Sequence, residues 1–101
     1  TIRNKNKLAL SSRNFLFKQN ELSDVEKISK NFFNLKNKIK YTKNINQFLQ
    51  KTKKDFERFL NIKIEYLENR DVNNLSISNK YHRSKIFLAY YYKSVRLIDN
   101  F

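Results

Sequence analysis

The chain contains no glycine and no proline in 101 residues, and this absence limits its fold more than any other feature. Glycine supplies the positive φ angles of tight hairpin turns and helix ends, while proline interrupts helices. Fifteen asparagines are available for left-handed positions instead. Long helices joined by Asn, Ser and Lys loops therefore fit this composition better than a sheet. The sequence predicts an all-α fold, a small bundle of three or four helices with a long antiparallel helix pair.

The charge balance is strongly positive. Lys and Arg number 22 against nine Asp and Glu, which gives a net charge of +13. Part of the lysine excess reflects an AT-rich coding sequence, because Phe, Tyr, Ile, Asn and Lys, which have AT-rich codons, supply 55 residues. A net positive charge of this size creates an electrostatic field that attracts polyanions, so nucleic acid is the first partner expected. The alternative is a helical protein whose surface lysines reflect codon drift.

The length supports one small domain. Residues 1–20 carry five positive charges and no acid, which is typical of a basic arm or of the tail of an organellar transit peptide. We therefore divide the chain into a basic N-terminal arm (1–20) and a single helical RNA-binding domain (21–101). The longest apolar run, 86–92, is far shorter than the ~20 residues of a membrane span.

Three helical regions are expected from apolar spacing. The first covers 23–40 and begins at a capping box formed by Ser23 and Glu26. The second covers 45–69, as one helix or two pieces. The apolar stripe of the first region recurs at steps of three and four. It consists of Val25, Ile28, Phe32, Leu35 and Ile39.

The third region, 78–101, is expected to be the last helix and to form the antiparallel pair with the second. One of its faces is apolar and the other is basic. The expected contact joins two stripes, namely Phe56, Leu60, Ile64 and Leu67 against Phe87, Tyr91, Val95 and Ile98.

No enzyme signature is present. The chain has one histidine, no cysteine and scattered acids, so we expect no catalytic residues, no metal site and no cofactor. The best candidate site is 79–85, where cations, an aromatic ring, an imidazole and a hydroxyl gather as in phosphate and base contacts. An ordinary basic helix start is the alternative. The RNA-binding residues expected here and on the basic face are Lys80, Tyr81, His82, Arg83, Ser84, Lys85, Lys93 and Arg96.

Residues 81–99 resemble the last helix of the small-subunit ribosomal protein fifteen family. His82 stands on the second of that family's paired histidines, Lys85 on its second arginine, and 97–99 on its Leu-Leu-Asp. Upstream, 60–67 resembles the end of its preceding helix. The order of Arg83 and Ser84 is inverted, and Ile86 replaces a glycine of the family.

The resemblance implies a structural component of an organellar small ribosomal subunit rather than an enzyme. The implied partners are small-subunit rRNA and neighbouring ribosomal proteins, in a mitochondrial or plastid ribosome, without a membrane span or homo-oligomer. His82, Ser84 and Lys85 would approach RNA at a loop-to-helix corner, while Lys93 and Arg96 would contact phosphate. The alternatives are another organelle-specific RNA-bound helical protein, or an accessory subunit of an organellar membrane complex.

Overall fold

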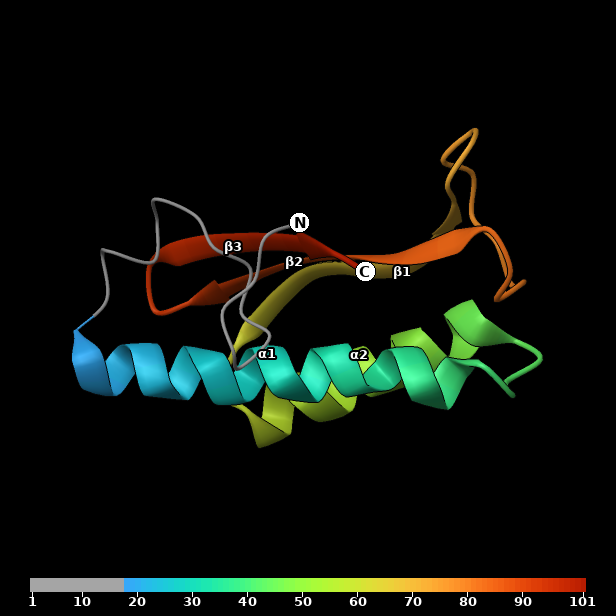
Figure 1. Cartoon of the computed structure of the whole chain (residues 1–101). Helices are drawn as coiled ribbons and strands as arrows, with labels where there is room; N and C mark the ends of the chain where they lie inside the picture. Colours follow the sequence, from blue (N-terminus) through green and yellow to red (C-terminus); the bar gives the residue numbers. More distant parts are fainter. Residues whose placement is uncertain (1–17) are drawn as a thin grey trace.

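A computed structural model describes residues 18–101 and shows two helices packed on one face of a three-stranded antiparallel sheet (Figure 1). The prediction of an all-α bundle is therefore wrong. The strand order is β1-β2-β3. The five elements, in chain order, are α1 (Gln19–Ile39), α2 (Ile45–Phe59), β1 (Lys63–Asp71), β2 (Ser84–Tyr92) and β3 (Val95–Asn100).

Helix α1 confirms the predicted apolar stripe, but not the predicted start. All five stripe residues, from Val25 to Ile39, are buried against the sheet and α2. The helix begins earlier than expected, because the backbone N–H of Lys18 donates to Glu21 Oε1 at 3.0 Å. Glu21 thus satisfies an N-terminal donor in place of the expected Ser23 and Glu26 pair. The expected arm boundary at residue 20 lies inside α1, and residues 1–17 of that arm lie outside the described residues.

Helix α2 occupies only the first part of the region predicted to be helical. Ile45, Leu49 and Thr52 face the core, and the helix ends at Phe59. Asn61 then adopts a φ of 54°, in the left-handed region where asparagine is tolerated. The chain reverses there and enters β1.

Strand β1 has apolar spacing that imitates a helix. Ile64 and Leu67 are both buried although they are three residues apart, and a register shift lies between Ile64 and Tyr66. The extra residue of such a bulge changes which side chains face the core. Beyond it, Leu67 and Asn69 alternate normally toward the helices.

Strands β2 and β3 replace the predicted helix over 78–101. Ile86, Leu88 and Tyr90 are buried at a period of two, so β2 turns one face to the core. A two-residue loop, 93–94, joins Tyr92 to its partner Val95 across the hairpin. The run of aromatic and β-branched residues suits a half-buried strand, and this preference outweighs the helical spacing in the same segment.

The core lies between the two layers. Phe32 meets the rings of Phe56 and Tyr90, each at a centroid distance of 5.2 Å. The predicted contact between two helical stripes is wrong, because β2 and β3 present alternate residues to opposite faces. Ile98, expected in that contact, is 50 % exposed.

The turns show how a glycine-free chain builds a sheet. Among residues 18–101, four non-glycine residues adopt positive φ near 55°, which costs roughly 1–2 kcal/mol for a residue carrying a Cβ. Only one of them is asparagine, so the expectation that asparagine would carry such positions holds at one of four turns. The four are Asn61, Leu75, Arg83 and Lys93.

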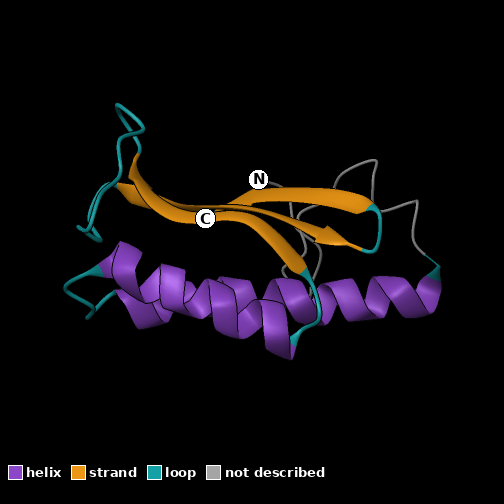
Figure 2. Ribbon diagram, turned by 180° about the vertical axis from the view of Figure 1, so that it is seen from behind, coloured by secondary structure: helices purple, strands orange, loops and turns teal. Residues whose placement is uncertain are grey.

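The long connection between β1 and β2 lies at one end of the sheet (Figure 2). A polar network ties it to α2. The Asn46 amide donates to the carbonyl of Ser78 at 2.7 Å, and its Oδ1 accepts the backbone N–H of Asn69 at 2.7 Å. The fully buried Asn69 side chain donates to the carbonyls of Ser78 and Lys80 at 3.0 and 3.3 Å. The network thereby fixes the chain just before residue 81.

Neither helix in residues 18–101 combines the length and the apolar character that crossing a membrane requires.

Candidate functional site

The structure divides the predicted site residues into two groups at opposite ends of β2. Residues 80–85 lie in the β1–β2 connection and at the start of β2, next to the turn between α1 and α2. Lys93 and Arg96 lie at or beside the β2–β3 hairpin, next to the N-terminal half of α1 (Figure 1). The predicted continuous basic face does not exist, because the two groups are separated by the length of a nine-residue strand.

Lys36 of α1 joins the first group, although nothing in our sequence interpretation selected it. Its Nζ donates to the carbonyl of Ser84 at 3.0 Å and lies 5.0 Å from the ring centroid of Tyr81. Burial lowers the pKa of the Lys36 ammonium, and the nearby charge of Lys85 lowers it further. The sequence did hold a signal, since Lys36 follows Phe32 by four residues and so borders the buried stripe of α1.

Ser84 and Tyr81 form the base of this group. The Ser84 hydroxyl is buried and donates to the Tyr81 carbonyl at 2.7 Å. The Tyr81 ring is partly buried against the core cluster. Both side chains therefore shape the turn, while Lys80, Arg83 and Lys85 are exposed around them and Lys36 is partly buried.

Arg83 and His82 lie at the tip of the same turn and are exposed. Arg83 has a φ of 56°, and its carbonyl accepts the N–H of Val72 at 3.0 Å. The backbone of this residue is thus held while its guanidinium extends into solvent.

The second group is paired with carboxylates. The Arg96 guanidinium makes a two-point contact with Glu65, at 3.0 Å from Nε and 2.8 Å from Nη2, and Lys93 pairs with Glu21. These contacts lower the pKa of both carboxyls, mainly through the hydrogen bonds from Arg96 and Lys93. Lys93 and Arg96, which the sequence predicted to contact phosphate, therefore each have a carboxylate partner within the fold.

We call the first group the basic corner and define it as Lys36, Lys80, Tyr81, Arg83 and Lys85. No ion pair among residues 18–101 includes any of its four cations. Ammonium and guanidinium groups around a fixed aromatic ring can bind carboxylate or phosphate oxygens. The basic corner is therefore a candidate anion-binding site.

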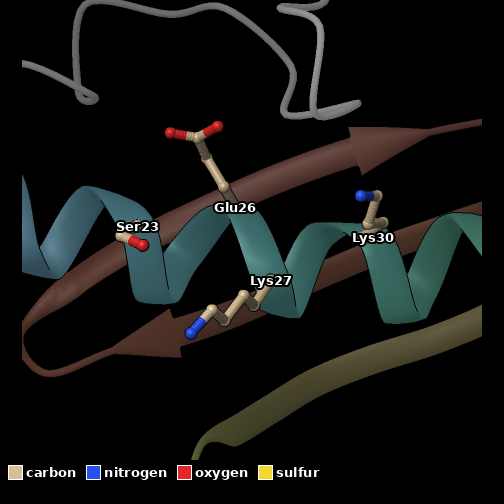
Figure 3. Close-up of a pocket in the computed structure, with 4 residues that line it drawn as sticks. All are labelled: Ser23, Glu26, Lys27 and Lys30. Atoms are coloured by element: carbon tan, nitrogen blue, oxygen red, sulfur yellow. The ribbon is translucent and has the colours of Figure 1, made fainter.

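Two hollows elsewhere on the surface are weaker candidates for a ligand site than the basic corner. Figure 3 shows one on the surface of α1, where Glu26 and Lys27 extend away from each other, so their charged groups do not converge on a ligand. The other, of about 520 Å³, lies between α1, the end of α2 and the hairpin, with Phe59 and Tyr92 among its walls. Within residues 18–101, no three His, Cys, Asp or Glu side chains group as metal ligands would.

Comparison with known proteins links the chain to enzymes. The family model of pantoate-beta-alanine ligase matches residues 1–101. A pantothenate synthetase from Ruthia magnifica subsp. Calyptogena magnifica is 36 % identical over 100 residues, which cover 98 % of this chain. The chain spans about a third of that relative, since the match covers 35 % of its length.

These matches overturn the functional predictions made from the sequence. The resemblance to ribosomal protein fifteen is wrong, because 81–99 forms a turn and two strands instead of a helix, and the whole chain matches a different family. That family is one of enzymes, so the expected absence of enzyme function is also wrong. The relative is a bacterial synthetase, which contradicts the ribosomal location, the rRNA and protein partners, and both alternatives.

Proposed function

Because the chain belongs to the pantoate-beta-alanine ligase family, we propose that it forms part of an enzyme that joins pantoate to beta-alanine. The observation that carries this proposal is the family match over residues 1–101, supported by the 36 % identity to a pantothenate synthetase. The chain spans about a third of that relative, so we propose that it acts as one region of the enzyme together with others.

The charge of the chain suits the reactants. Pantoate is an anion at neutral pH, whereas beta-alanine is a zwitterion whose carboxylate is balanced by its ammonium, and the chain has a net charge of +13. A positive surface raises the local concentration of anionic substrates and stabilises negative charge that develops during amide formation. We propose that the region contributes in this way, by attracting and orienting anionic groups.

The test is a chimera. The 100 matched residues of the Ruthia magnifica synthetase are replaced by this chain, and pantothenate formation is measured from pantoate, beta-alanine and a nucleoside triphosphate. The triphosphate is needed because a free carboxylate must be activated before an amine can displace one of its oxygens. We expect activity within about tenfold of the parent, a barrier change of about 1.4 kcal/mol.

A matched control carries the same chimera with Leu67→Asp, which places a charge in the fully buried core and should abolish the activity. A chimera that is folded by circular dichroism but forms no more pantothenate than the synthetase lacking this region would contradict the proposal.

A further inference from the structure

The basic corner combines four cations with a fixed aromatic ring, at the place where α1 meets the start of β2. We propose that it is a binding site for a small oxyanion, a phosphate or carboxylate group, held between Lys36 and Lys85 with Arg83 and Lys80 at its rim. This goes beyond the ligation reaction proposed above, and its test does not require catalysis.

The Lys36 ammonium is held in a fixed position and keeps free N–H donors. An ammonium has three N–H donors, and the Ser84 carbonyl takes one of them at 3.0 Å. Two donors therefore remain on a group whose position is fixed by Ser84 and by the Tyr81 ring below it. Lys36 follows the buried Leu35 on α1, so the backbone of Lys36 cannot move without disturbing the core.

Electrostatics favours an anion between these side chains. The Ser84 carbonyl, which accepts the Lys36 hydrogen bond at 3.0 Å, directly precedes Lys85, so the Lys36 ammonium lies beside the backbone of Lys85. The charge of Lys85 adds to burial in lowering the pKa of the Lys36 ammonium. Two neighbouring like charges repel each other in the unliganded site, and an oxyanion between them would offset that repulsion. At the other end of the sheet, by contrast, Lys93 and Arg96 already have Glu21 and Glu65 as partners.

The loop that carries the rim is held in place before any ligand arrives. The Asn69 amide donates to the Lys80 carbonyl at 3.3 Å, and the N–H of Lys80 donates to Ser78 Oγ at 3.1 Å. The Ser84 hydroxyl closes the turn on the Tyr81 carbonyl. Because this backbone is already ordered, binding would cost less conformational entropy than in a mobile loop.

The competing interpretation is that Lys36 is a tether only, a side chain that ties α1 to β2 through the Ser84 carbonyl. A tether and a binding site make different predictions for Lys85, which is exposed and has no part in that hydrogen bond. A substitution at Lys85 therefore separates the two, even if variants of Lys36 fail to fold.

The experiment titrates the 101-residue chain, at low ionic strength, with inorganic phosphate and separately with acetate. Two-dimensional NMR follows the backbone amides and the lysine Cε–Hε signals. We expect saturable shifts confined to the basic corner and a rise of the Lys36 pKa toward its ordinary value, because a bound anion stabilises the charged ammonium. The anion that saturates at the lower concentration identifies the source, phosphate or carboxylate.

Three single variants complete the test. Lys85→Gln and Lys36→Gln should each weaken binding about fivefold or more, since each removes a charge-assisted contact. Lys93→Gln removes the same charge at the other end of the sheet and should change affinity by less than about twofold. The proposal is overturned if all three weaken binding equally, which indicates non-specific attraction, or if no signal at the basic corner shifts in either titration.

Discussion

Replacing Asn46 with alanine tests how the β1–β2 connection is held beside the basic corner. The Asn46 side-chain amide donates to the carbonyls of Ser78 and Asn69, at 2.7 and 3.2 Å, and its Oδ1 accepts the backbone N–H of Asn69 at 2.7 Å. These bonds bring together α2, β1 and the chain that leads to the predicted site. Alanine removes all of them at once and leaves the helix able to form.

The expected loss follows from what remains unpaired. The backbone N–H of Asn69 belongs to a fully buried residue and would lose its acceptor, at a cost of about 1–3 kcal/mol. The Ser78 carbonyl keeps a second donor, the Asn69 amide, so its loss is smaller. Alanine regains a few tenths of a kcal/mol in helix propensity. We therefore expect a loss of about 2–4 kcal/mol in the free energy of unfolding.

The assay is urea unfolding followed by circular dichroism at 222 nm. The matched control is Asn31→Ala, because Asn31 also donates its amide to a carbonyl, that of Lys27 at 2.9 Å, but does so on an exposed helix face. We expect the control to change stability by less than about 0.5 kcal/mol. If Asn46→Ala is as stable as the control variant, the polar network does not hold the loop.

Three further predictions follow from burial, backbone angle and charge. Leu67→Ala should cost about 2–5 kcal/mol in urea unfolding because Leu67 is fully buried, whereas Ile98→Ala, half exposed, should cost less than about 1 kcal/mol; equal losses would contradict the assigned faces of the sheet. Leu75→Gly should stabilise the folded protein by roughly 0.5–1 kcal/mol. Glycine removes the steric strain of a side chain at φ 59°, and this gain exceeds the cost of the greater conformational entropy that glycine gives the unfolded chain. A destabilised variant would refute this prediction. The hydrogen bond from Arg96 lowers the pKa of Glu65 from its ordinary 4.5, so the stability that this ion pair contributes is present above that pH and is lost on acidification. The melting temperature of Glu65→Gln should therefore fall less than that of the wild type between about pH 7 and pH 3, and an equal fall would count against the pair.

The sequence predicts the helical layer well because there the local and tertiary signals agree. The buried stripe from Val25 to Ile39 has a period that only a helix places on one face, and α1 buries every member of it. The break after Ile39 and the start of α2 at Ile45 follow from the same pattern. Only the first turn of α1 differs, because Glu21 takes the capping role expected of Glu26.

The sheet could not be read from spacing alone. The bulge in β1 places Ile64 and Leu67 three residues apart on one face, which is a helical interval. In β2, the stripe from Phe87 to Tyr91 has a four-residue step that fits a helix and also fits one face of a strand. The absence of glycine then favoured helices, although the chain places Leu75, Arg83 and Lys93 in left-handed turns at an energetic cost.

The candidate site was predicted in part. Residues 80–85 do lie together, as their composition suggested, but Lys36 joins them only because α1 packs beside the start of β2. Lys93 and Arg96 were assigned to the same face on a helix that does not exist, and their carboxylate partners are distant in sequence. Pairings of this kind depend on the fold of the sheet, which the spacing of residues did not reveal.

The measurement that tests the central claim most directly is pantothenate formation by a purified enzyme that includes this chain. Isotope-labelled beta-alanine is supplied with pantoate and a nucleoside triphosphate, and the products are separated by mass spectrometry. We expect the label to appear in pantothenate, and its formation to require both pantoate and the triphosphate. A folded protein that leaves all the label in beta-alanine under these conditions would contradict the proposed function.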